Sequence, residues 1–306
     1  MLDAKHNESY KISMNKLDPK TRAQIVHLLC EGQSIRAVTR LTGSSKNTVT
    51  KLLCDAGKAC MTYHDANVVN VKSKRIQVDE IWSFTYAKQK NVKTAVAVPD
   101  GAGDMWTWTA IDADSELIVS YFVGGRDGEC AMWFMDDLRS RLADRVQLTS
   151  DGHKAYLEAV EGAFGADIDY AQLVKIYGPT VTAPGRYSPV ECTGAKKKPV
   201  EGDPDLAQIS TSYVERQNLT MRMHMRRFTR LTNSFSKKVE NHAYAMALHM
   251  MYYNFVRLHK TLRTSPAMAA GASAKLWEVS DIVALLDADA IPKKRGPYKK
   301  TLALST

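Results

Sequence analysis

Cysteine is scarce in this sequence of 306 residues, which has five cysteines and no CxxC pair. The odd number and irregular spacing argue against a disulfide framework and favour a reducing compartment. Cys54, Cys60 and His64 could be considered as zinc ligands. Because no fourth ligand is evident, we interpret the two thiols as buried side chains instead.

Long apolar stretches are also missing. No apolar run approaches the roughly 18 residues that a membrane-spanning helix requires. The first residues, MLDAKHNESYK, lack the apolar segment of a signal peptide. We therefore expect no membrane partner and a cytoplasmic protein.

Acidic residues are outnumbered by basic ones. The chain has 33 Asp and Glu against 42 Lys and Arg, a net charge of +9. This sign favours a polyanionic partner, and nucleic acid is the commonest one. Hydrophobic residues make up 44% of the chain, which is enough for a sizeable core. The length allows one large domain or two to three smaller ones.

Three short helical patterns follow a polar, flexible N-terminus at residues 1–13. Together they predict an all-α helix-turn-helix domain at 14–57, with a turn at Gly43 before the third helix. The outward face of that helix carries DNA-binding candidates, and it has no acid before Asp55. An ordinary three-helix bundle is the alternative. The candidates are Lys46, Asn47, Thr50 and Lys51.

The apolar period changes from helical to alternating after a predicted linker at 58–73. We expect three antiparallel strands, a helix, a buried strand, a helix and a further strand. This order is typical of an RNase H-like α/β domain, which we place at 74–272. The expected elements are strands 76–84, 105–112 and 116–124, helix 127–142, strand 146–151, helix 154–164 and strand 168–177.

The last third of the chain is predicted to be mainly helical. Residues 178–208 are rich in Pro, Gly and Lys, and we expect an insertion loop there. Long helices are expected at 210–230 and 238–258. A C-terminal helix and a basic tail should occupy 273–306.

Three carboxylates stand where such a fold would bring them together. Asp79 lies midway along the first strand, Asp151 ends the fourth, and Glu215 begins a late helix. Two Mg²⁺ ions about 3.5–4 Å apart can activate a nucleophile and stabilise a leaving oxygen, and Mn²⁺ could substitute. Mg²⁺ prefers such oxygen ligands. We expect Asp79 to bridge both ions and the other two acids to complete one shell each.

Each acid also has an ordinary interpretation. Asp151 before Gly152 could be a turn residue, and Glu215 could be one of many helix glutamates. Glu80 should face away from Asp79 as a solvent or salt-bridge residue. The joint placement of the three acids on one plausible fold favours the catalytic interpretation.

Arginines follow Glu215 along the same predicted helix. Arg222 is two helical turns after it, on the same face, and could hold a DNA phosphate. Arg226 and Arg227 are further candidates for contact with the DNA backbone. An ordinary basic helix is the alternative.

Four segments resemble bacterial insertion-sequence DDE transposases, in the branch founded by the smallest classical insertion sequence, the IS-one type. Three of them resemble the acidic motifs of this family, and the fourth resembles its C-terminal segment. They are VDEIWSF (78–84), TSDGHKAY (149–156), YVERQNLTMRMHMRRFTRLTNSFSKK (213–238) and YYNFVRLHKTLRTSPAMAAG (252–271).

The resemblance covers about residues 15–272. It implies Asp79, Asp151 and Glu215 as metal ligands, with Arg222 as their basic partner. It also implies 3′ cleavage of transposon ends, strand transfer into double-stranded target DNA and a nucleoid-associated location. We expect a homo-oligomer on DNA, since two ends must be joined together.

Two features depart from the family, and two other functions stay open. The Cys-rich zinc finger of many relatives is missing, and the basic tail lies outside the shared region. A nuclease of the same fold without strand transfer would need the same metals. A transposase-derived regulator would bind DNA without cleaving it, but the intact acid triad argues against this.

Overall fold

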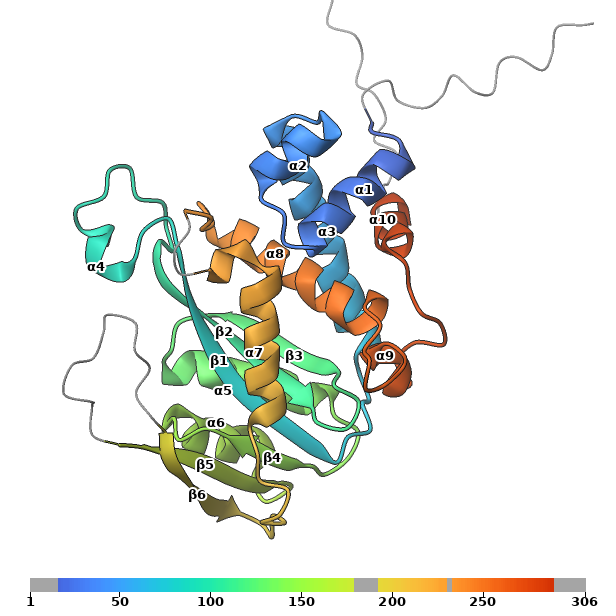
Figure 1. Ribbon diagram of the computed structural model, residues 1–306. Coiled ribbons are helices and arrows are strands. Elements are labelled where there is room, and N and C mark those ends of the chain that lie inside the picture. The colour runs from blue at the N-terminus through green and yellow to red at the C-terminus, as the bar shows by residue number, and fades with distance from the viewer. Residues whose placement is uncertain (1–15, 179–191, 230–232, 289–306) are drawn as a thin grey trace, which may run out of the picture.

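The computed structural model describes residues 16–178, 192–229 and 233–288 and places one six-stranded sheet between helices (Figure 1). The strand order is β3-β2-β1-β4-β5-β6. β1 pairs antiparallel with β2 and parallel with β4, so the sheet is mixed. The strands are β1 (Arg75–Thr85), β2 (Gly103–Asp112), β3 (Ile118–Gly124), β4 (Gln147–Ser150), β5 (Asp169–Tyr177) and β6 (Cys192–Glu201).

Helices cover both faces of the sheet. In Figure 1, α7 lies in front of the sheet and α5 and α6 lie behind it, while α1, α2, α3 and α10 gather above. The α-helices are α1 (Pro19–Cys30), α2 (Ile35–Thr42), α3 (Lys46–Asn67), α4 (Gln89–Val92), α5 (Gly128–Arg141), α6 (Ala155–Phe164), α7 (Ser212–His224), α8 (Val239–Met251), α9 (Pro266–Ala269) and α10 (Val279–Ala288). Among the described helices, none is both long and apolar enough to cross a bilayer.

The first five strands and the helices α5 and α6 lie where their apolar periods predicted them. β1 shows this most clearly. Helices cover both faces of this strand, so nearly all of its side chains are buried or half-buried. Alternation sends its side chains to opposite helix layers. Glu80 accepts a hydrogen bond from Tyr156 on α6, whereas Asp79 accepts one from Asn218 on α7.

The prediction of an insertion loop at 178–208 is wrong for residues 192–201. Residues 192–201 form β6, an edge strand paired antiparallel with β5. Its side chains are almost all exposed, so no alternation of apolar residues marked it in the sequence. Backbone pairing forms the strand, and three consecutive lysines from Lys196 to Lys198 suit an exposed edge. Residues 179–191 lie outside the described residues.

The three N-terminal helices are present, and side chains cap each of them. Asp18, Ser34 and Ser45 accept hydrogen bonds from backbone amides in the first turns of α1, α2 and α3. Gly43 ends α2 with φ of 69°, a left-handed conformation that glycine adopts without strain. The expected flexible segment 1–13 lies outside the described residues.

The predicted linker at 58–73 is wrong through Asn67, because α3 continues for 22 residues. Ala56, Cys60 and His64 extend its buried stripe beyond the expected end. At Gly57 a Cβ would stand 2.2 Å from the backbone oxygen of Tyr244, so α3 and α8 pack at very short range. The helical segment therefore shares its core with the sheet.

α8 lies inside the protein. Met246, Met250 and Met251 on it are fully buried. The chain continues as a π-helix (Tyr252–Val256), where Asn254 exchanges two hydrogen bonds of 2.9 Å with the backbone of Ile118 on β3. α8 packs mainly against α3, and His242 near its start lies 3.2 Å from Ser83 Oγ on β1.

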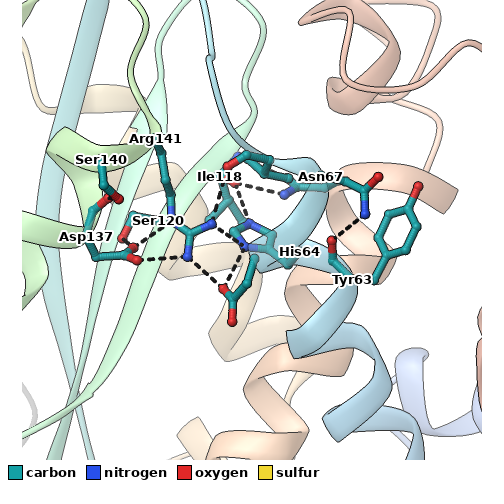
Figure 2. A network of polar contacts seen from close by, with 11 residues as sticks. Tyr63, His64, Asn67, Ile118, Ser120, Asp137, Ser140 and Arg141 are labelled. Atoms are coloured by element: carbon teal, nitrogen blue, oxygen red, sulfur yellow. Dashed lines mark hydrogen bonds and ion pairs between the residues drawn. The ribbon is translucent and has the colours of Figure 1, made fainter. Parts of the chain in front are cut away.

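A polar network joins α3 to α5 and β3 (Figure 2). Arg141 donates to both oxygens of Asp137, at 2.7 and 2.8 Å, and to Asp65 at 2.7 Å. His64 contacts Arg141 and the backbone oxygen of Ile118. Of the two thiols expected to be buried, Cys60 is buried, whereas Cys54 is only half-buried.

Candidate active site and basic cavity

Asp79 stands on the face of β1 that α7 covers. Asn218 donates to its Oδ2 at 2.8 Å. Burial, together with the neighbouring carboxylates of Glu80, Asp151 and Glu215, raises the pKa of Asp79 to about 7. The charged form of Asp79 is therefore costly without a nearby cation.

Asp151 follows the last residue of β4, next to β1. Gln77 on β1 is paired with Thr149 on β4 in parallel register. Asp79 and Asp151 each stand two residues beyond this last pair, near enough for the charge of Asp151 to raise the pKa of Asp79. The backbone N–H of His153 donates to Asp151 Oδ1 at 2.8 Å, so Asp151 also shapes the turn.

Glu215 stands in the first turn of α7, and a side chain of β1 anchors that turn. The buried Gln77 Oε1 accepts hydrogen bonds from the backbone N–H groups of Tyr213, at 2.8 Å, and Val214, at 3.2 Å. Glu215 Oε1 pairs with Lys175 Nζ of β5 at 2.7 Å and accepts from the hydroxyl of Thr211. Lys175 thus places a positive charge beside Glu215, whose carboxylate also raises the pKa of Asp79.

The three acids come together without forming a ready cation site. Among the described residues, no group of three or more His, Cys, Asp or Glu side chains is arranged to hold a metal ion. Asn218 instead donates to Asp79, and Lys175 pairs with Glu215.

Glu80 faces the other helix layer, as strand alternation predicted, and it is an ion-pair residue rather than a solvent-exposed one. Its side chain is buried, with Arg126 Nε at 2.6 Å and the Tyr156 hydroxyl at 2.9 Å. His153 stacks on Trp108 close by. Glu80 and these partners thus pack on the face of β1 opposite to Asp79.

The predicted DNA-binding residues meet around one cavity of about 950 Å³ between α1–α3 and the α7–α8 connection. Lys46, Asn47, Thr50 and Lys51 line it from α3. Arg226 and Arg227 line it from the segment after α7. Arg222 lies one turn before that segment, and its side chain is exposed.

The charge of this basic cavity has one sign. Its lining includes six Lys and Arg side chains and, among the described residues, no Asp or Glu; the cations are Arg36, Lys46, Lys51, Arg226, Arg227 and Lys237. Burial lowers the pKa of Arg227 to about 10, so it stays protonated at neutral pH. Arg36 and Lys237 were not among the sequence candidates.

The sequence analysis also did not identify Gln77 and Lys175 as residues of the candidate site. Gln77 stands two residues before Asp79 on the same face of β1, and an amide at this spacing from a catalytic candidate is a usable signal. Lys175 stands near the end of β5, next to the edge strand β6. Nothing in its local sequence indicates an ion pair with Glu215, 40 residues later in the chain.

Comparison with known proteins bears on the segment that carries Glu215. Residues 193–256 match the family described as IS1 transposase. The chain is similar to the IS1 transposases. The predicted resemblance is thereby confirmed over β6, α7 and α8, a stretch that includes Glu215, Asn218 and Arg222 but neither Asp79 nor Asp151.

Solved structures give weaker likenesses to transposases. A piggyBac transposase synaptic complex with hairpin DNA shares 8% identity at a TM-score of 0.43, covering 88% of this chain and 69% of that one. A Mos1 strand transfer complex shares 13% identity at a TM-score of 0.23, covering 79% and 77%. A Mos1 paired-end complex shares 12% at 0.20, covering 50% and 59%. No curated protein matches the chain.

Proposed function

We propose that this protein is a DNA transposase that binds insertion-sequence ends, cleaves the 3′ donor strands and joins them to target DNA. One observation carries the proposal. The segment similar to IS1 transposases is held against β1 by the hydrogen bond between Asn218 and Asp79, which brings Glu215 toward two strand acids.

The catalytic fold supporting this activity is, we infer, RNase H-like. Its core would be the first five strands in the order β3-β2-β1-β4-β5, with β6 added at the edge. Asp79 on the central strand is then the most rigid platform, and Asp151 and Glu215 approach it from the neighbouring strand and from the covering helix.

The donor chemistry of the three acids fits Mg²⁺ or Mn²⁺. Carboxylate oxygens are the hard ligands that these ions prefer, and a bound cation would favour the charged form of Asp79, whose pKa is raised by burial and by its acidic neighbours. Asp79, Asp151 and Glu215 would hold the metal, and two ions would activate the nucleophile and stabilise the leaving oxygen. Lys175 would release Glu215 as the ions bind.

Double-stranded DNA is the proposed partner, both as transposon ends and as target. The basic cavity joins the face of α3 proposed for helix-turn-helix recognition to Arg226 and Arg227. Arg222 lies in the last turn of α7 and would contact a phosphate near the acids. A homo-oligomer on paired ends and a nucleoid location belong to the same proposal.

Cleavage and strand transfer with the element's own end DNA test this function. We expect Asp79→Asn, Asp151→Asn and Glu215→Gln each to abolish Mg²⁺-dependent cleavage while end binding persists. Replacing Lys46, Asn47, Thr50 and Lys51 by Ala should instead weaken end binding, by about 1–3 kcal/mol for each base-contacting side chain.

Two results would contradict the proposal. A triad variant that cleaves at the wild-type rate removes that acid from the site. Cleavage without any joined product, using pre-cut ends and target DNA, favours the hydrolytic nuclease, which keeps the same acids and metals.

A further inference from the structure

Aromatic rings and lysines lie close together around the C-terminal end of β1. The ring centroids of Trp82 and Phe84 on β1 are 5.8 Å apart, and Phe235 lies 4.9 Å from Phe84. Lys88 Nζ lies 5.5 Å from the Trp82 ring and 5.9 Å from Phe84. These residues, with Tyr86 and Lys237, make up the aromatic–lysine cluster.

The second lysine completes the pattern. Lys237 Nζ lies 5.0 Å from the Phe235 ring and 5.3 Å from Tyr86. Within the described part of the chain, neither Lys88 nor Lys237 forms an ion pair with a carboxylate. Both charges are held over ring faces, a placement that leaves them available to an anion.

The rings themselves are only partly covered. Trp82 and Phe84 stand on the same face of β1 as the buried Glu80, yet both are half-buried. Trp106, opposite Trp82 in the β1–β2 register, is half-buried too, with the Arg126 guanidinium 4.7 Å from its ring centroid. A purely structural cluster at this position would be expected to bury its large rings as fully as Trp108, two residues along β2.

The cluster is continuous with the basic cavity. Phe235 and Lys237 belong to both, since they line the cavity together with Arg226 and Arg227. A strand whose phosphates lie among those cations would pass its bases over the rings. Rings interleaved with cations beside a positive groove are what single-stranded nucleic acid binds, because every base has a face that stacks.

We propose that the aromatic–lysine cluster binds unpaired bases of a DNA strand whose phosphates occupy the basic cavity. The assignment rests on the proposed function for its choice of DNA. It adds a substrate requirement, because paired bases inside a duplex cannot reach the ring faces without leaving the stack. DNA that is unpaired where its backbone crosses the basic cavity is then the preferred substrate.

The test compares two strands of equal charge bound to the full-length protein, followed by fluorescence anisotropy. One is oligothymidine of about 15 nucleotides, near the upper site size for such grooves, and the other is an abasic strand of the same length. We expect the thymine strand to bind about tenfold more tightly, the scale of one or two stacked bases.

Variants then locate the effect. Trp82→Leu and Phe235→Leu should each bring the ratio of the two affinities close to one, and Trp82→Phe should keep most of it. Trp133→Leu is the matched control, because Trp133 is 53% exposed on α5, outside the cluster. Phe235 lies in a half-exposed loop, so its replacement reports on binding even where Trp82→Leu unfolds the protein.

Three outcomes would overturn the assignment. The first is wild-type protein that binds the abasic strand as tightly as the thymine strand. The second is a folded Phe235→Leu variant that keeps the full ratio. Tighter binding of oligouridine than of oligothymidine is the third, since it would point to RNA. Duplex end cleavage, lost in Asp79→Asn, is measured separately, so the cluster can fail while the transposase activity stands.

Discussion

Arg141, at the end of α5, makes ion pairs and hydrogen bonds that join α3 to α5, and its replacement is the most direct stability test of this arrangement (Figure 2). Burial by itself lowers the pKa of Arg141, but hydrogen bonds to Asp137 and Asp65 outweigh this and hold the pKa above its ordinary value. Arg141→Met keeps the apolar part of the side chain and removes the charge. Two ion pairs and a hydrogen bond to the backbone oxygen of Val68 are lost.

The size of the loss follows from the surroundings. Removing one partner of a fully buried ion pair costs about 3–5 kcal/mol, because the other charge stays buried. Here the Asp137 and Asp65 side chains are 38% and 58% exposed, so water solvates them after the change. We therefore expect the free energy of unfolding to fall by about 2–3 kcal/mol, a melting temperature about 3–5 °C lower for a chain of this length.

Arg139→Met on the same helix is the control. Arg139 and its partner Asp167 are 40% and 54% exposed, a surface pair that contributes about 0–1 kcal/mol. Thermal unfolding followed by circular dichroism compares the two variants with wild type. Equal melting temperatures for Arg141→Met and Arg139→Met would refute the reasoning that Arg141 couples α3 to α5.

Three further predictions concern other contacts. Gly57→Ala should destabilise the protein by about 1–3 kcal/mol through overpacking against Tyr244, whereas Gly162→Ala, with open space around it, should not; equal melting temperatures would contradict the close packing of α3 on α8. Hydrogen bonds from Arg22 and Lys16 lower the pKa of Asp287 to about 2, against 3.8 ordinarily, so its contribution is present above pH 3.8 and lost as pH falls toward 2. Asp287→Asn should therefore flatten the acid dependence of the melting temperature in that window, and an unchanged slope would count against it. Gln77→Leu should slow cleavage with little change in end-DNA affinity, because it frees the turn that positions Glu215; loss of affinity with an unchanged cleavage rate would assign Gln77 a different role.

Local periodicity predicted most of the fold. β1 to β5, α5 and α6 were recognisable because each buries a stripe of apolar residues that repeats along the chain. The candidate acids were identifiable for the same reason, since Asp79 and Asp151 interrupt or end buried strands. The match of residues 193–256 to the IS1 transposases bears out the resemblance that the motif around Glu215 carried.

Elements without such a stripe were missed or misread. β6 exposes nearly every side chain, and its backbone pairing with β5 leaves no pattern in its own sequence. The second half of α3 was taken for a linker, because its buried residues are small or polar and make sense only against α8. Leu219 and Met223 on α7 are exposed although they are apolar, so composition alone did not identify the buried side of this helix.

By itself, the sequence determined which residues could do chemistry: three carboxylates, a run of arginines and a basic face on α3. Only the tertiary structure decided which of them meet. Gln77 positions the turn of Glu215, Lys175 pairs with it, and Lys46 shares a cavity with Arg226. These contacts join segments far apart in the chain, so they depend on how helices and strands pack together, and no local pattern of residues encodes that packing.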